Sequence, residues 1–166
     1  MKKLPPFFIL TIALFLALPS TRAHIGETPE QCDTRYGAPV KVEQETDKHD
    51  AYRAYLKSGF IIIALFHQGI CDLVAFQKQE RDALHESAEI STNEINILLK
   101  SNGENSPWIK GADGMHTVCC WNTENGKISA TYDSIQSHCL NIVTSDYLKR
   151  QDEKRKSEEA KNLKWL

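Results

Sequence analysis

The sequence predicts an α+β fold in which short, capped helices pack on an antiparallel β-sheet. Two capping-box sequences, Thr28 to Gln31 and Ser91 to Glu94, mark the starts of two helices. Runs rich in Ile, Val and Phe follow the first of these, and such runs are typical of buried strands. The turn signals His67-Gln68-Gly69 and Asn125-Gly126 separate neighbouring runs and favour hairpins, whose strands are antiparallel.

The first 23 residues have the layout of a secretory signal peptide. A basic start precedes an apolar run from Phe7 to Leu18, and small residues before Ala23 suit cleavage between Ala23 and His24. The apolar run is shorter than the ~20 residues that cross a bilayer, which disfavours the alternative of an uncleaved anchor. No cysteine follows the cleavage site to carry a lipid. We therefore expect a secreted or periplasmic protein.

Composition and charge exclude several classes of protein. The 166 residues carry a net charge of −2, and removal of the signal, with its three basic residues, leaves −5 on the mature chain. A nucleic-acid binder needs clustered positive charge, so we expect no nucleic-acid partner. The mean hydropathy of −0.43 excludes a polytopic membrane protein, and no run after the signal is long enough to cross a bilayer. The mature length predicts one α+β domain over residues 24–148.

The elements of the first half follow from local signals. The first helix ends at Gly37, because Pro39 cannot continue it. Val40 and Val42 alternate with charged residues and predict a short strand, and residues 51–56 predict a second.

The runs Phe60 to Phe66 and Ile70 to Phe76 predict the two strands of a hairpin. The first run is apolar on both faces, so we expect it to lie inside the sheet with both of its faces covered. The residues expected to be buried in this hairpin are Ile61, Ile63, Leu65, Val74 and Phe76.

The second half repeats this order. Residues 77–89 are charged and predict a linker, and the second helix follows Ser91 and ends at Asn102-Gly103. Three further strands are expected, at Met115 to Asn122, Lys127 to Tyr132 and Cys139 to Val143.

The two halves can be aligned at an offset of 63 residues. This offset sets Thr28 on Ser91, Cys32 on Ile95 and Tyr36 on Leu99, which gives the two helices one shared face. The order favours two similar helix-plus-hairpin units, over residues 24–78 and 89–148.

Residues 149–166 predict a charged C-terminal helix or tail. The stretch from Lys149 to Ala160 has high helix propensity and no large apolar side chain that could dock it. The terminal residues Leu163, Trp165 and Leu166 either fold back on the domain or contact a partner.

The segment from Gly26 to Pro39 has the pattern G-x-T-x-x-x-C-x-x-R-Y-G-x-P, and it resembles the opening of a family of uncharacterised small secreted bacterial proteins. The hairpin around Gly69 and the helix after Ser91 also resemble that family, so the likeness covers most of the mature chain. More distantly, a capped helix that ends in Gly-x-Pro before a hairpin is similar to BamE/SmpA-like outer-membrane assembly lipoproteins and to the β-lactamase-inhibitor-protein fold. The first resemblance implies no activity, and the second implies protein binding.

Five cysteines are candidates for disulfides or for buried thiols: Cys32, Cys71, Cys119, Cys120 and Cys139. The most metal-like group is His116, Cys120 and Cys139, but the paired ligand spacings of structural zinc sites are absent, so we expect no metal site. Cys71, Asp72 and His67 offer the residue types of a thiol nucleophile, without a local signature of catalysis. We expect no catalytic residue and no cofactor.

The sequence therefore favours a secreted or periplasmic, non-enzymatic protein with a protein-binding or envelope-associated role, for which an envelope protein is the candidate partner, in an oligomeric state that the sequence does not predict. The alternative is a small thiol- or metal-dependent enzyme. An open hydrophobic sheet face with scattered cysteines would support the first function, and convergence of the metal-like group would support the second. Trp108 and Trp121 are either exposed binding aromatics or part of the core.

Overall fold

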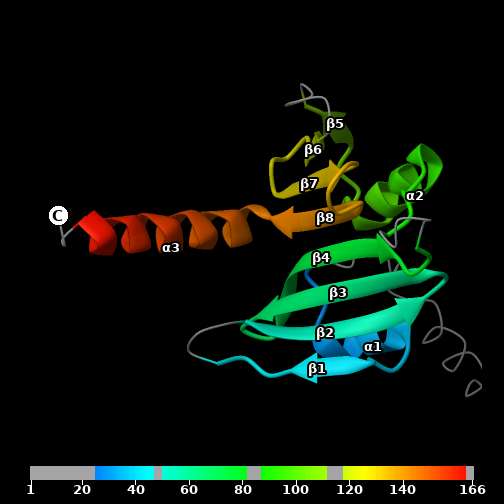
Figure 1. The fold of residues 1–166 in the computed structure, drawn as a ribbon, viewed down its shortest axis with the longest axis horizontal. Helices are drawn as coiled ribbons and strands as arrows, with labels where there is room; N and C mark the ends of the chain where they lie inside the picture. Colours follow the sequence, from blue (N-terminus) through cyan, green and yellow to red (C-terminus); the bar gives the residue numbers. More distant parts are fainter. Residues whose placement is uncertain (1–24, 47–49, 82–86, 112–117, 164–166) are drawn as a thin grey trace, which may run out of the picture.

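A computed structural model describes residues 25–46, 50–81, 87–111 and 118–163. These residues form an α+β fold, as predicted from the sequence (Figure 1). The helices are α1 (Pro29–Tyr36), α2 (Thr92–Asn102) and α3 (Ser145–Leu163). The strands are β1 (Lys41–Glu43), β2 (Ala51–Lys57), β3 (Phe60–His67), β4 (Ile70–Lys78), β5 (Trp108–Lys110), β6 (Val118–Thr123), β7 (Ile128–Asp133) and β8 (Cys139–Thr144).

The strands form one eight-stranded antiparallel sheet in the order β1-β2-β3-β4-β8-β7-β6-β5. Each half of the sheet is a run of four consecutive strands that follows one helix. The halves join where β4 pairs with β8, in a register that sets Leu73 opposite Val143 and Gln77 opposite Cys139. The two edges of the sheet are therefore the short strands β1 and β5, and short edges limit pairing with other chains.

Both predicted capping boxes are present. The backbone N–H of Thr28 donates to the side chain of Gln31 at 2.8 Å, and the N–H of Gln31 donates to the Thr28 hydroxyl at 3.4 Å. Ser91 and Glu94 make the same reciprocal pair at 2.9 and 3.3 Å. The first helix ends at Gly37, whose φ of 95° is accessible to glycine at little cost.

The core lies between the sheet and the two short helices. α1 buries Cys32 and Tyr36, and α2 buries Ile95 and Leu99, which are the positions that the 63-residue offset aligns. Beneath the helices, buried side chains alternate along neighbouring strands and therefore share one face of the sheet. They are Tyr55, Ile62, Ala64, Phe66, Val74, Phe76, Ala130, Tyr132, Leu140 and Ile142.

The expectation that β3 would be covered on both faces is wrong. Val74 and Phe76 are buried as predicted, but Ile63 is 36% exposed, and Ile61 and Leu65 are only half-buried. The reason is geometric: among the described residues, α1 and α2 cover one face of the sheet, and alternate side chains of β3 point to the other.

Two strands also differ from the sequence prediction. β4 continues to Lys78, into the segment expected to be a linker, because its last residues pair with the start of β3. The short strand β5 was not predicted, since three residues around Trp108 give too little alternation to detect.

α3 follows β8 directly and projects away from the sheet (Figure 1). It buries none of its described residues, as expected for a helix without an apolar stripe, and Leu163 is 66% exposed. Among the described residues, no helix is long and apolar enough to cross a membrane. The predicted cleavage site at Ala23 and His24, and the terminal residues Trp165 and Leu166, lie outside the described residues.

Candidate functional site

The helix-free face of the sheet carries an apolar patch. Cross-strand neighbours point to the same face, so register identifies its members: Leu56 lies opposite Ile61, and Leu65 lies between β2 and Leu73. We call Leu56, Ile61, Ile63, Leu65 and Leu73 the apolar patch. Leu56 is 46% exposed, and Ile63, between Ala54 and Ala75 in the register, is 36% exposed. Large exposed apolar side chains that are grouped on one surface are typical of binding sites.

The patch is confined to the first half of the sheet. In the second half, the same face presents the polar side chains of Asn141, Thr131 and Asn122, together with Val143, which is buried opposite Leu73. The helix-free face thus has an apolar part over β2 to β4, which Val143 of β8 borders, and a mostly polar part over β8 to β6. A partner that buries the apolar part would meet hydrogen-bonding groups beyond it.

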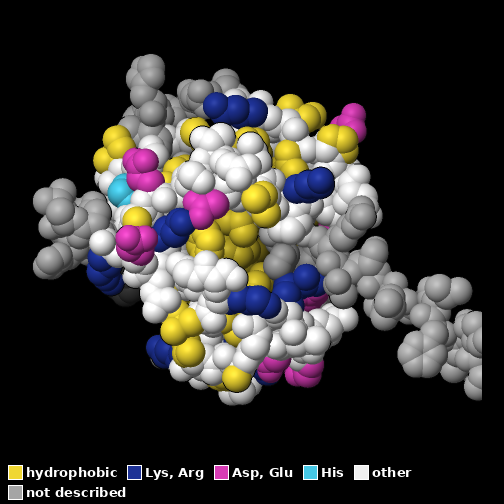
Figure 2. Space-filling view, turned by 90° about the vertical axis from the view of Figure 1, so that its right-hand side faces the viewer, with side chains coloured by type: hydrophobic (Ala, Val, Ile, Leu, Met, Phe, Trp, Pro, Cys, Tyr) yellow, Lys and Arg dark blue, Asp and Glu magenta, His cyan; other side chains and the backbone are white. Residues whose placement is uncertain are grey.

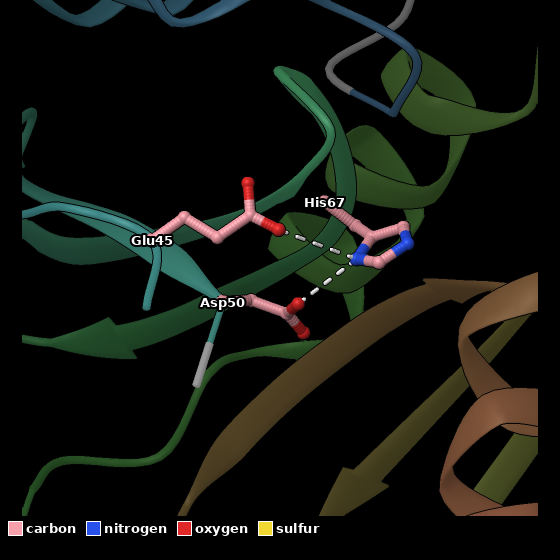
Figure 3. Close-up of side chains that lie close together, drawn as sticks. All are labelled: Glu45, Asp50 and His67. Carbon is pink, nitrogen blue, oxygen red and sulfur yellow. Dashed lines mark hydrogen bonds and ion pairs between the residues drawn. The ribbon is translucent and has the colours of Figure 1, made fainter. Parts of the chain in front are cut away.

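Three polar side chains meet at one end of the patch. His67 ends β3, Asp50 directly precedes β2, and the β2–β3 register brings the two together. Nδ1 of His67 lies 3.0 Å from Oδ1 of Asp50 and 3.8 Å from Oε1 of Glu45 (Figure 3). We call this group the carboxylate–histidine cluster. All three side chains are partly exposed, so solvent reaches the two carboxylates.

The carboxylate–histidine cluster has the donor set of a cation site. Its three ligand atoms lie within 4.8 Å of one another. Carboxylate oxygens and an imidazole nitrogen suit several divalent metals. The same arrangement also serves as a hydrogen-bonded group in which Nδ1–H of His67 donates to Asp50. Without a bound cation, the two carboxylates give this end of the patch a negative potential.

A buried ion pair lies close to the cluster. Asp72 is the extra residue of a β-bulge, since Leu65 pairs with Leu73 but Phe66 pairs with Cys71. Its side chain is 8% exposed; Oδ2 accepts from Arg150 of α3, while Oδ1 has no hydrogen-bond partner among the described residues. Burial raises the pKa of Asp72, and Arg150 opposes that rise. The pair fastens the first turns of α3 to β4.

The structure does not assemble the metal-like group expected from the sequence. Cys120 and Cys139 point to the helix-free face, but β7 lies between their strands, which separates them by two strand spacings of ~4.8 Å. His116 lies outside the described residues. The thiol group is not assembled either, because Cys71 points to the helices and His67 points to the opposite face.

The five cysteines differ in their burial. All five are free thiols: Cys32 and Cys71 are fully buried, and Cys119, Cys120 and Cys139 are half-buried. Cys119 and Cys120 point to opposite faces of β6, as expected for neighbours on a strand. Burial raises the pKa of the Cys139 thiol, which disfavours its thiolate.

The two tryptophans belong to the border of the core. Trp108 and Trp121 are half-buried and pack against the core, and Nε1 of Trp108 donates to the carbonyl of Leu99 at 2.7 Å. With Ile97 and Pro107 they line a groove between α2 and the edge of the sheet. On the side where α2 lies, hydrophobic side chains gather near the centre of the surface and charged side chains surround them (Figure 2).

Sequence reasoning missed the carboxylate–histidine cluster and the Asp72–Arg150 pair. His67 was recognised as a turn residue, but its partners come from a polar stretch that carries no motif. Arg150 is one of many charges in α3, and no local signal distinguishes it. Only the register of the sheet and the start of α3 bring these groups together.

Comparisons with known proteins identify no family. No family model matches the chain, and no curated protein matches it. One similar solved structure is a cysteine-rich secretory protein from Staphylococcus aureus subsp. aureus Mu50, at 12% identity and a TM-score of 0.43. The match covers 75% of this chain and 44% of that one, so the chain spans less than half of its length.

Proposed function

We propose that this chain is a secreted or periplasmic protein that acts without catalysis, by binding an envelope protein through the apolar patch. The observation that carries the proposal is the exposure of Leu56 and Ile63 on the sheet face opposite α1 and α2. The layout of the first 23 residues supports export. The resemblance to assembly lipoproteins and to the β-lactamase-inhibitor-protein fold also implies protein binding, by analogy of fold.

The chemistry of the face indicates what kind of partner fits it. Burial of the remaining exposed area of Leu56 and Ile63 contributes on the order of 1 kcal/mol each. Glu45 and Asp50 add negative charge at one end of the patch. The complementary surface is therefore a group of apolar side chains flanked by Lys or Arg. A stable interface needs ~800 Å² from each partner, so the partner must also contact the polar part of the face.

A matched pair of charge substitutions tests the proposal. Ile63→Asp places a carboxylate in the patch, whereas Ile97→Asp places one on α2, where Ile97 is 59% exposed. Both variants should fold, because neither side chain is buried. The mature chain and both variants are cross-linked to envelope proteins in the periplasm, and captured partners are purified and titrated against each chain.

We expect the Ile63→Asp variant to lose at least tenfold in affinity for its partner and Ile97→Asp to retain it. Higher salt should weaken binding by the unchanged chain, because the flanking charges are exposed. If both variants captured the same partner equally well, the apolar patch would not be the binding surface, although a partner would have been identified.

The alternative function, a small thiol- or metal-dependent enzyme, can be tested at the carboxylate–histidine cluster. Under our proposal, adding Zn²⁺ or Mn²⁺ to the mature chain leaves its thermal midpoint unchanged. Stoichiometric binding that His67→Ala abolishes would support the alternative, since His67 supplies the one nitrogen ligand of the group.

A further inference from the structure

Two fully buried thiols meet beneath α1. Cys32 lies in α1, Cys71 lies at the start of β4, and both side chains are 0% exposed. Glu27 contacts both residues: its carboxylate accepts from the Cys32 thiol at 3.8 Å, and both cysteines belong to the same buried core cluster. The backbone holds them in place, because the N–H of Gly26 donates to the carbonyl of Cys71 at 2.7 Å and the N–H of Cys71 donates to the carbonyl of Glu27 at 2.8 Å.

We propose that Cys32 and Cys71 form a disulfide in the exported protein and so tie α1 covalently to β4. The inference rests on the proposed export, since disulfides form and persist in oxidising compartments. Glu27 touches Cys71 through its backbone and Cys32 through its carboxylate, so the two buried thiols lie on neighbouring elements of one cluster, and a local approach brings them to the S–S bond length of ~2.05 Å. The other described cysteines are not arranged in this way: Cys119 and Cys120 point apart, and β7 separates Cys120 from Cys139.

The oxidant is a protein or small-molecule disulfide, and the chemistry is thiol–disulfide exchange. One cysteine loses its proton and attacks a sulfur of the oxidant, which forms a mixed disulfide and releases one thiolate. The second cysteine loses its proton and attacks the protein sulfur of the mixed disulfide, which releases the other thiolate. The two protons end on the released thiols, and the two electrons that the cysteines lose reduce the oxidant's disulfide.

The burial of the pair determines when this reaction occurs. The attacking species is the thiolate, and in the folded chain the neighbouring Cys32 and burial both raise the pKa of Cys71. An oxidant also cannot reach side chains that are fully buried. The bond therefore forms before α1 docks on the sheet. After docking, the same burial protects the bond from reductants.

The remaining interactions of the two residues accommodate the bond. The Cys32 thiol donates to the Glu27 carboxylate at 3.8 Å, a long contact, and Glu27 keeps its ion pair with Arg35 when that thiol proton is gone. The Cys71 thiol donates to the carbonyl of Leu73 at 3.3 Å, across the bulge of its own strand. Oxidation thus removes two weak thiol donors and leaves no buried charge unpaired.

The test uses the full chain with its signal, exported to the periplasm, with free thiols alkylated under denaturing conditions before peptide mapping. We expect a Cys32–Cys71 cross-linked peptide, lighter by about 2 Da than the two reduced peptides, for the loss of two hydrogens. Cys119, Cys120 and Cys139 should be alkylated. Alkylation of Cys32 and Cys71 in a chain that begins at His24 would overturn the disulfide and leave export intact.

If the chain stays in the cytoplasm, the proposed export is wrong, and the absence of a disulfide says nothing about the pairing of the cysteines. The pairing is then tested in vitro. The unfolded, reduced chain is then refolded in a glutathione redox buffer and mapped in the same way. A Cys32–Cys71 peptide supports the inference, and free thiols at both positions overturn it.

A second measurement separates the bond from packing effects. Reduction of the unfolded chain before refolding should lower the thermal midpoint by about 10 °C, since the bond closes a long loop. The double variant Cys32→Ala/Cys71→Ala should show no such dependence on reductant, whatever its own midpoint. The control Cys120→Ala should keep the full dependence. Equal dependence in the double variant would overturn the assignment.

Discussion

The Arg150→Ala substitution should destabilise the protein strongly, although Arg150 lies at the start of a helix that buries nothing. Its guanidinium pairs with Asp72, whose side chain is 8% exposed and whose second oxygen has no partner among the described residues. Removal of one member of a buried pair leaves an uncompensated charge, which costs ~3–5 kcal/mol. Arg150 is itself 30% exposed, so we expect the lower value, about 3 kcal/mol.

The effect should depend on pH with a defined sign. The pKa of Asp72 is raised in the folded protein, chiefly by burial, so folding favours its protonated form. Stability from this group is therefore highest below the unfolded pKa of ~3.9 and falls as pH rises through the folded pKa. Loss of Arg150 raises the folded pKa further. The variant should thus be closest to the unchanged chain at acid pH and furthest from it at neutral pH.

Urea unfolding of the mature chain at pH 7 and pH 4.5 measures both effects, and a thermal midpoint about 10 °C lower is expected at neutral pH. Arg155→Ala is the matched control, since its ion pairs in α3 are exposed and should contribute less than ~1 kcal/mol. Asp72→Asn combined with Arg150→Ala should recover part of the loss, because it removes the buried charge.

A chain ended after Arg150 keeps the pair and should retain nearly the full thermal midpoint. Exposed ion pairs contribute about 0.5 kcal/mol to the free energy of unfolding. If Arg150→Ala lowered that free energy by no more than this, the assignment of a buried pair would be refuted. A large cost for the truncation would show that the rest of α3 docks on the domain.

Three further predictions follow from burial, charge and the N-terminus. Ile63→Ala should cost about 1 kcal/mol or less, because Ile63 is 36% exposed, whereas Phe76→Ala should cost ~3–5 kcal/mol, and denaturant unfolding compares the two. The bond from Lys78 lowers the pKa of Glu94 to about 2, so this carboxylate stabilises the fold above pH ~4.5 and the contribution is lost as pH falls toward 2; Glu94→Gln should flatten that acid-side loss in a pH series. N-terminal sequencing of exported material should begin at His24, and an intact start on a membrane-held chain would contradict the signal.

Much of the fold could be predicted because its signals are local. The capping boxes at Thr28 and Ser91 place two helix starts through side chains only three residues apart. The hairpin around Gly69 follows from two apolar runs and one turn. Strand and helix starts of this kind depend on contacts within a few residues, which a sequence displays directly.

The rest depends on contacts between distant residues. Whether Ile63 is buried depends on which face of the sheet the helices cover. The apolar run that contains Ile63 is the same whichever face is covered, so the sequence does not distinguish the two. The bulge at Asp72 is visible only when β3 and β4 are paired, and its partner Arg150 lies beyond four more strands of the chain. The meeting of Cys32 and Cys71 likewise follows from the docking of α1, which no spacing in the sequence displays.

The pairing of β4 with β8 also has a kinetic consequence. Within each half, every strand pairs with the next one along the chain, so most contacts can form early and locally. We call this β4–β8 pairing the seam. It joins residues 73–77 to residues 139–143 and closes a long loop, so its formation should be the slow, late step of folding. Until it closes, each half exposes a five-residue row of unpaired backbone groups. Two molecules that meet at this stage can exchange halves, so dimers formed at high refolding concentration should be domain-swapped through the β4–β8 seam.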